Sequence, residues 1–367
     1  MSVTGQTAAV SAPAQQRVVR GGIRPFLEKN GGLLFGGLLV VIFIICSVVI
    51  VARRGPSEFG NQLVLGLQRG AIYALIAVGY TMVYGIIELI NFAHADVFTL
   101  SAFYSLVIGE ALDKVGFHVG SIAPGSLGGL LLVLLIVLPL TMFLGGMTGV
   151  VIERVAYRPL RDAPKLAPLI TAIGVSFLLQ GIMFAVFGSG DVNAKKDKWI
   201  RGAAFSIGDV RVGWNDVFVI VTAILLMLVL QAFIRYSRTG KAMRATAQDR
   251  DAALLSGINI NRIISTTFFI GSAIAGGGAL IYAIYYNDLQ FNLGFKIGII
   301  AFTAAVLGGI GNIVGAGLGG FLIGLVFVFG TELIGPQWAE SLVFVMLILV
   351  LTLRPTGLLG LRVPDRA

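Results

Sequence analysis

The feature of this sequence that most limits its fold is a succession of long apolar runs separated by short polar segments. A helix that crosses a bilayer needs roughly 20 mostly apolar residues. Ten runs approach or exceed this length: 32–52, 62–88, 93–112, 127–152, 167–188, 215–235, 263–286, 294–310, 315–334 and 338–353. Within 62–112 and 294–334 the runs are joined by such short pieces that a re-entrant segment is an alternative to a full span. We therefore predict an all-α, polytopic transmembrane helical bundle of about 8–10 spans.

Composition indicates a surface that faces lipid. Charged residues make up only 12% of the chain and hydrophobic residues 57%, whereas about a quarter of a soluble domain is charged. The net charge of +9 does not favour nucleic-acid binding, because the basic residues lie between apolar runs, and membrane proteins collect such residues in cytoplasmic loops. We expect a multi-pass protein of the inner (plasma) membrane, in contact with lipid and without a nucleic-acid partner.

The distribution of Lys and Arg predicts the orientation. If all ten runs span and both ends are cytoplasmic, inside segments hold 17 of these residues and outside segments hold 8, as the positive-inside rule favours. The long outside segment 189–214 is the exception, since it alone carries five basic residues. An odd number of spans would instead place the N terminus outside.

The chain divides into four parts by composition. Residues 1–31 are rich in Ala, Ser, Gly and Gln and are expected to form a disordered cytoplasmic tail. Residues 32–55 are expected to form an extra N-terminal transmembrane helix, predicted to be peripheral and dispensable for the activity of the chain. The main transmembrane domain covers 56–360, and 361–367 form a C-terminal tail.

Several chemistries are absent from the sequence. No GxxxxGK[ST] phosphate loop occurs, because Ala242 follows Gly240-Lys241, so the chain is not expected to hydrolyse ATP itself. Neither a GxSxG elbow nor an HExxH motif is present. The single cysteine, Cys46, and the two histidines offer no metal-ligand spacing, so we predict no metal and no cofactor. The apolar runs lack the repeated charges of proton-coupled carriers. We predict a conduit that is passive or powered from outside, and not an enzyme.

The inside loop 236–262 is the most informative polar segment. Residues 241–256 are rich in Ala and Leu, which favour helix, and Gly257 stands where a helix commonly ends. We predict one short cytoplasmic helix there. It is either a solvated connector or a helix that docks into a groove of a cytoplasmic partner.

A polar cluster interrupts the second and third runs. Asn91, His94 and Asp96 lie between them, and Glu88 lies just before. These side chains either cap helix ends at a turn or line a conduit or gate. A carboxylate at Glu88 needs a partner or water, and we predict an interaction with His94. Tyr80 and Tyr84 share one helical face, either as a core stripe or as part of a path. The many glycines of 271–324 favour close helix packing, which also suits alternating access.

Six blocks of sequence resemble the branched-chain amino-acid permeases of binding-protein-dependent ABC importers. The blocks are Arg235–Asn259, Tyr73–Ile87, Asn91–His94, Glu153–Arg161, Ala301–Gly311 and Arg354–Gly360. The resemblance covers about 60–360. Four departures lie near the blocks: Glu88 stands where the family usually has Gly, Ala95 stands where Gly usually precedes the acid, Gln248 replaces an acid, and Ile300 stands at the usual lysine position, with Lys296 one turn earlier.

The resemblance implies the fold of an ABC importer permease, with partners that supply energy and substrate. These partners are two cytoplasmic ATP-binding-cassette ATPases, a sister permease, and a periplasmic or lipid-anchored substrate-binding protein. The substrate is leucine, isoleucine or valine, with urea or short amides as the alternative. A self-sufficient carrier or channel is the alternative of another class. The implied ATPase-coupling helix carries Arg244, Ala247, Gln248, Asp249, Ala253, Leu254 and Gly257. The candidates for the translocation path are Tyr80, Tyr84, Glu88, Asn91, His94, Asp96, Phe302 and Thr303.

Overall fold

The computed structural model of the 367-residue chain describes residues 23–115, 133–192 apart from 162 and 165, 202–286 and 288–360. Among these residues, nine helical segments are long and apolar enough to cross a membrane, and a tenth, α11 (Leu293–Gly308), is shorter. The nine are α1 (Ile23–Arg54), α2 (Pro56–Ile87), α3 (His94–Lys114), the segment Val133–Leu160 around α5 (Leu138–Ile152), α6 (Leu166–Phe187), α7 (Trp214–Tyr236), α10 (Ile260–Tyr286), α12 (Ile313–Ile334), and α13 (Ala339–Leu353) with the turn η4 (Pro336–Trp338). The predicted bundle of 8–10 spans is confirmed.

The first helix is longer than the predicted span. α1 begins at Ile23, so residues 23–31 of the expected disordered tail are helical, and the helix starts earlier than predicted. Residues 1–22 of that tail, 127–132 of the fourth expected span, and the C-terminal tail 361–367 lie outside the described residues.

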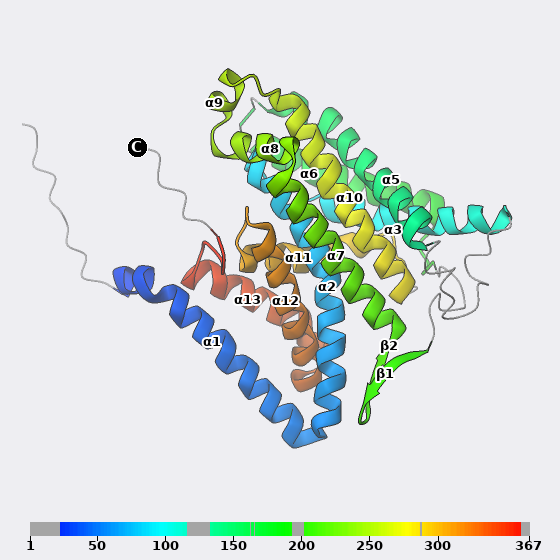
Figure 1. Cartoon of the computed structure of the whole chain (residues 1–367), viewed down its shortest axis with the longest axis vertical. Coiled ribbons are helices and arrows are strands. Elements are labelled where there is room, and N and C mark those ends of the chain that lie inside the picture. The colour runs from blue at the N-terminus through cyan, green and yellow to red at the C-terminus, as the bar shows by residue number, and fades with distance from the viewer. Residues whose placement is uncertain are drawn as a thin grey trace, which may run out of the picture.

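The helices α2 and α10 form the centre of the bundle (Figure 1). In each, 83% of the most apolar stretch is buried, against 11% in α1 and 22% in α6 and α13. Small residues allow α12 to approach α2 closely, because a Cβ on Gly320 would lie 2.3 Å from the Cα of Ala74. The predicted use of glycine for close packing is confirmed at this contact.

The two ends of the bundle differ in structure. Figure 1 shows the short helices α8 (Arg238–Gln248) and α9 (Arg250–Leu255) at one end, and a hairpin of β1 (Ala203–Ile207) and β2 (Val210–Gly213) at the other. The hairpin is antiparallel, with Phe205 opposite Val212. It is an addition to the predicted all-α architecture, within the segment 189–214.

Further contacts assign the remaining loops to these two ends. At the hairpin end, the hydroxyl of Ser57, beside the α1–α2 corner, donates to Asp209 at 3.4 Å. Residues 191–192 and 288–290 also meet, because the amides and carbonyls of Val192 and Leu289 exchange hydrogen bonds of 2.9 and 3.1 Å. Partial burial and then the carboxylate of Asp191 raise the pKa of Asp288 in this loop.

The chain's C-terminal described residues lie at the α8–α9 end. The amide of Leu358 donates to the carbonyl of Leu307 at 2.8 Å, and a Cβ on Gly85 near the end of α2 would lie 3.5 Å from Gly311 in the α11–α12 turn. α1 ends at the hairpin end, where Arg54 pairs with Glu332 at 2.9 Å.

The segment 241–256 is not the single helix that its composition predicts. It belongs to two helices, because Asp249 is extended (φ −155°, ψ 114°) and its carboxylate accepts hydrogen bonds from the amides of Asp251 and Ala252 at 2.9 and 3.0 Å. An aspartate in this role begins a new helix. The predicted stop at Gly257 is confirmed, since its φ is +79° and its amide bonds to the carbonyl of Leu254 at 2.9 Å.

Candidate functional site

The turn between α2 and α3 folds the polar cluster back into the bundle. α2 is capped by Glu88, whose backbone is left-handed (φ 56°, ψ 24°) and whose amide donates to the carbonyl of Tyr84 at 2.8 Å. The next helix begins at His94, whose amide bonds to the carbonyl of Asn91 at 3.1 Å. The His94 ring then packs on Gly79, where a Cβ would lie 2.3 Å from Nε2. Because Gly79 is about two turns before the end of α2, the start of α3 lies inside the membrane region.

Aromatic side chains surround this point. The ring of Tyr80 lies 4.9 Å from that of His94 and 6.2 Å from that of Phe302 on α11, centroid to centroid. Phe302 also lies 6.4 Å from Phe92. His94 is completely buried, and neither ring nitrogen has a well-formed hydrogen bond within the described part of the chain. We call Tyr80, Tyr84, His94 and Phe302 the aromatic cluster.

A narrow apolar pocket opens beside the aromatic cluster. Its lining consists of Tyr80, Thr81, Tyr84, Ile90, Phe302, Ala305 and Ile310. Thr303 does not line it, because that side chain is fully buried and its hydroxyl donates to the carbonyl of Ile299 at 2.9 Å. The structure thus brings together Tyr80, Tyr84 and Phe302 of the predicted path and separates Thr303 from them.

The other members of the polar cluster hold neighbouring helices. The hydroxyl of Tyr157 donates to Asn91 Oδ1 at 3.0 Å. Asp96, almost fully buried, accepts hydrogen bonds from the hydroxyl of Ser176 and, at 3.1 Å, from Gln180 Nε2, both on α6. Asn91 and Asp96 therefore fasten the start of α3 to the α5 segment and to α6. The sequence reasoning missed these three partners, although Ser176 and Gln180 are polar, four residues apart, in an apolar run.

The predicted interaction between Glu88 and His94 is wrong. His94 is buried against α2, whereas Glu88 is exposed at the helix end and lines a different pocket, in which Arg161 and Arg250 also lie. The left-handed backbone at Glu88 turns the chain, so that the side chains of Glu88 and His94 point in different directions. Arg250, at the start of α9, donates to the carbonyl of Ile86 at 2.6 Å, which ties the α8–α9 segment to the last turn of α2.

The helices α8 and α9 present one packed face and one exposed face. Met243, Thr246 and Ala253 are buried against the bundle. Of the predicted coupling residues, Ala247, Gln248, Asp249 and Leu254 are exposed, while Arg244 donates to the carbonyl of Ile234 on α7. Leu254 and Leu255, 60% and 90% exposed, form an apolar tip on α9. No other described part of the chain covers this apolar tip.

The sequence was compared with known proteins. Residues 62–351 match the family described as branched-chain amino acid transport system / permease component. The chain belongs to this family. It is 42% identical over 305 residues to the high-affinity branched-chain amino acid transport system permease protein BraD of Pseudomonas aeruginosa, covering 82% of this chain and 95% of the relative. It is 40% identical over 307 residues to the protein LivH of Escherichia coli K12, with 82% and 96% covered. No solved structure matches the chain significantly.

Membership of the permease family places α1 outside the shared region. The family match begins at residue 62, within α2. Nearly the whole length of each relative is matched, whereas about a fifth of this chain is not. The multi-pass inner-membrane location follows from the membrane helices and from these relatives.

Replacing Glu88 by glycine is expected to stabilise this permease by about 0.5–1 kcal/mol. Glu88 is the one non-glycine residue with positive φ in the described part of the chain. A left-handed conformation costs a residue with a Cβ about 1–2 kcal/mol, and the greater freedom of glycine in the unfolded chain offsets part of the gain. The thermal midpoint in detergent measures the effect. Glu88→Ala is the matched control, because it removes the carboxylate but keeps the Cβ; an equal rise in that variant would contradict the backbone explanation.

Proposed function

We propose that the chain is the membrane subunit of an ABC importer that moves leucine, isoleucine and valine into the cell. A periplasmic or lipid-anchored binding protein delivers the amino acid, two cytoplasmic ATPase subunits hydrolyse ATP, and a sister permease completes the conduit. The observation that carries this proposal is the 40–42% identity along almost the full length of relatives named as high-affinity branched-chain amino acid permeases.

The aromatic cluster is proposed as the part of the path that contacts the substrate. Tyr80, Tyr84 and Phe302 offer an apolar wall to an aliphatic side chain. The cluster is formed by α2, α3 and α11, so a relative movement of these helices would open or close it. In this proposal Asn91, Asp96 and Thr303 position the helices and do not contact the substrate, which revises the role expected for them from sequence.

The α8–α9 segment is proposed as the ATPase-coupling element. Its apolar tip, Leu254 and Leu255, enters a groove of the ATPase. Movement of α9 is transmitted through the hydrogen bond from Arg250 to the carbonyl of Ile86, which lies less than one turn beyond Tyr84 and less than two turns beyond Tyr80 on α2. This short route joins the proposed ATPase contact on α9 to the aromatic cluster, as alternating access requires.

The test of the proposed function combines purification and transport. The full-length chain is expressed in its native cells and purified in mild detergent, and the retained proteins are identified by mass spectrometry. The complex is then reconstituted in proteoliposomes for uptake of labelled leucine. The proposal expects an ATPase and a second permease to copurify, and uptake to require ATP. Uptake of leucine without ATPase subunits would favour a self-sufficient carrier, and uptake of labelled urea in place of leucine would overturn the substrate.

Deletion of residues 1–55 is expected to leave transport within about twofold of the full chain. α1 contacts the bundle through the fully buried Phe35, through the small cluster of Ile50, Val328 and Phe329, and through the ion pair of Arg54 with Glu332. It lies before the family match. Uptake per inserted protein measures the effect, with insertion checked by gel filtration. Loss of uptake in a truncated protein that still inserts and elutes as one peak would show that α1 takes part in transport.

A further inference from the structure

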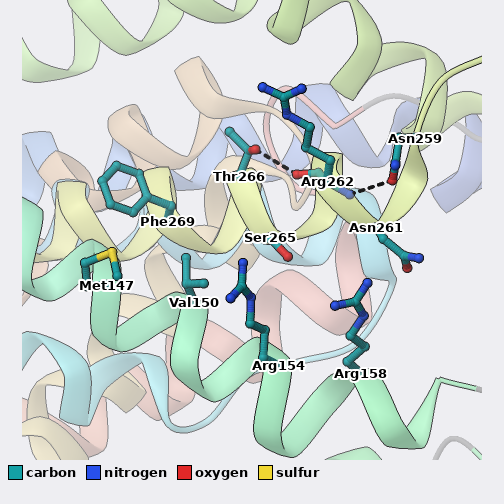
Figure 2. Close-up of a pocket in the computed structure, with 10 residues that line it drawn as sticks. All are labelled: Met147, Val150, Arg154, Arg158, Asn259, Asn261, Arg262, Ser265, Thr266 and Phe269. Atoms are coloured by element: carbon teal, nitrogen blue, oxygen red, sulfur yellow. Dashed lines mark hydrogen bonds between the residues drawn. The ribbon is translucent and has the colours of Figure 1, made fainter.

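A groove lined by three arginines lies between the α5 segment and the start of α10, away from the aromatic cluster. Its volume is about 540 Å³, within the range of small-molecule sites. Figure 2 shows Arg154 and Arg158 rising from one stretch of helix toward Ser265 and Asn261 on α10. The third arginine, Arg262, stands on α10 itself. None of the ten lining residues is acidic.

The arginines of this groove have no anionic partner among the described residues. The ion pairs found there join Arg54 to Glu332 and Arg161 to Glu153. Glu153 is next to Arg154 in sequence, but it is fully buried and is already bonded to Arg161 and, at 2.6 Å, to the hydroxyl of Ser265. This nearby carboxylate is therefore already engaged, and the three guanidinium groups are exposed and pair with no carboxylate of the described residues.

Two amide groups add neutral donors to the guanidinium groups. Asn259 Oδ1 accepts from the amide of Arg262 at 3.0 Å, and Asn261 Oδ1 accepts from the guanidinium of Arg161. Because both side-chain oxygens are used, the two NH₂ groups are left to donate. The groove thus offers arginine and amide donors, and its lining among the described residues holds no carboxylate. This is the chemistry that holds a phosphate group.

The opposite part of the groove is apolar and continues onto the lipid-facing surface. Met147, Val150 and Phe269 form this part, and Phe269 is fixed by Gly146, where a Cβ would lie 2.7 Å from its ring. Just outside, Val151 and Val155 are 55% and 73% exposed, as expected of side chains in contact with acyl chains. The basic part lies at the α8–α9 end, because α10 begins three residues after Gly257. The groove therefore spans the boundary between acyl chains and headgroups on the cytoplasmic side.

We propose that this groove binds an anionic glycerophospholipid of the inner leaflet, with Arg154, Arg158 and Arg262 on its phosphate and an acyl chain along Met147, Val150 and Phe269. Basic pockets between membrane helices on the cytoplasmic side take such headgroups. The bound lipid links the α5 segment to α10, whose first residues follow directly from α9. This assignment rests on membrane insertion, on the groove and on the cytoplasmic placement of the α8–α9 end in the proposed function, and it does not depend on which substrate is transported.

The test measures lipid selectivity in the full-length chain. The protein is delipidated, placed in nanodiscs of phosphatidylcholine with a small fraction of phosphatidylglycerol, and the lipids retained after transfer to detergent are counted by native mass spectrometry. The proposal expects retained phosphatidylglycerol in the parent chain and a loss on the order of tenfold in the double variant Arg154→Gln, Arg158→Gln. The control is the double variant Arg53→Gln, Arg211→Gln, which removes the same charge from exposed positions at the hairpin end and is expected to retain the lipid.

Two further arms identify the source of the phosphate and exclude a protein ligand. Glycerol 3-phosphate at millimolar concentration is expected to leave the lipid bound; displacement by this soluble anion would show a phosphate site without acyl recognition and would overturn the lipid assignment. Equal phosphatidylglycerol retention in the groove variant and the control would also overturn it. The same is true if the groove variant keeps the lipid and loses a copurifying ATPase, since the arginines would then serve a protein contact.

Discussion

Replacement of both Leu254 and Leu255 by aspartate is expected to release the ATPase and to reduce uptake to background, while the permease still folds and inserts. Burying one leucine in a partner stabilises a complex by about 1.5–3 kcal/mol, and a buried, unpaired carboxylate opposes binding further. The affinity for the ATPase should fall by at least on the order of a hundredfold. Folding should be spared because both side chains are 60% or more exposed, whereas Ala253 holds α9 to the bundle.

The matched control for this variant lies on the hairpin. Phe205 and Ile207, 51% and 70% exposed, are changed to aspartate in the same way. The amount of ATPase that copurifies per permease is measured for both variants. We expect loss in the leucine variant alone. Retention of the ATPase by the leucine variant at the parent level would show that the apolar tip of α9 is not the docking surface, even if uptake is impaired.

The spanning helices of this protein are predictable because each one corresponds to a single continuous apolar run in the sequence. Nine of the ten predicted spans have the length that a bilayer requires. The two shortest runs are 294–310 and 338–353, and the first of them yields the short helix α11. Apolar length is a local property, so the sequence suffices to find it. The start of α1 was placed too late because polar and glycine residues precede its apolar run, and a helix extends beyond the apolar run when nothing stops it.

In the α8–α9 segment, the mean helix propensity of a stretch of sequence gives the wrong number of helices. The Ala and Leu content of 241–256 favours one helix, but Asp249 makes two, because its carboxylate satisfies the amides of a new helix. The sequence did carry a signal, since an aspartate followed by Arg-Asp-Ala-Ala suits a helix start. A single capping residue outweighs the summed propensity of its neighbours at such a point.

The candidate site was predictable as a place and not as a set of contacts. Asn91, His94 and Asp96 were found because they are polar between apolar runs. Their partners depend on side-chain directions in a turn and on helices 66 and 84 positions away, as for Tyr157 with Asn91 and Gln180 with Asp96. The error over Glu88 and His94 has the same origin, because proximity in sequence does not determine direction where the backbone is left-handed.

Replacement of Glu153 by alanine is expected to destabilise the permease by roughly 3–5 kcal/mol, the largest loss of stability that we predict. Glu153 lies fully buried in the π-helical turn Glu153–Tyr157, where it bonds to Arg161 and to Ser265 on α10. Its removal leaves Arg161 without an anion and the half-buried hydroxyl of Ser265 without its acceptor. The thermal midpoint in detergent should fall by at least about 5 °C.

Three further variants separate the ion pair from other effects. Glu340→Ala removes an exposed carboxylate at the start of α13 and should change the midpoint little. Glu153→Gln keeps an acceptor for Ser265 and should lose less than alanine. Glu153→Ala combined with Arg161→Ala should lose less than the sum of the single losses, because each single change leaves a charge unpaired that the double change removes. Strict additivity would show that the carboxylate and the guanidinium do not depend on each other, and the buried pair would then contribute nothing to holding the α5 segment against α10.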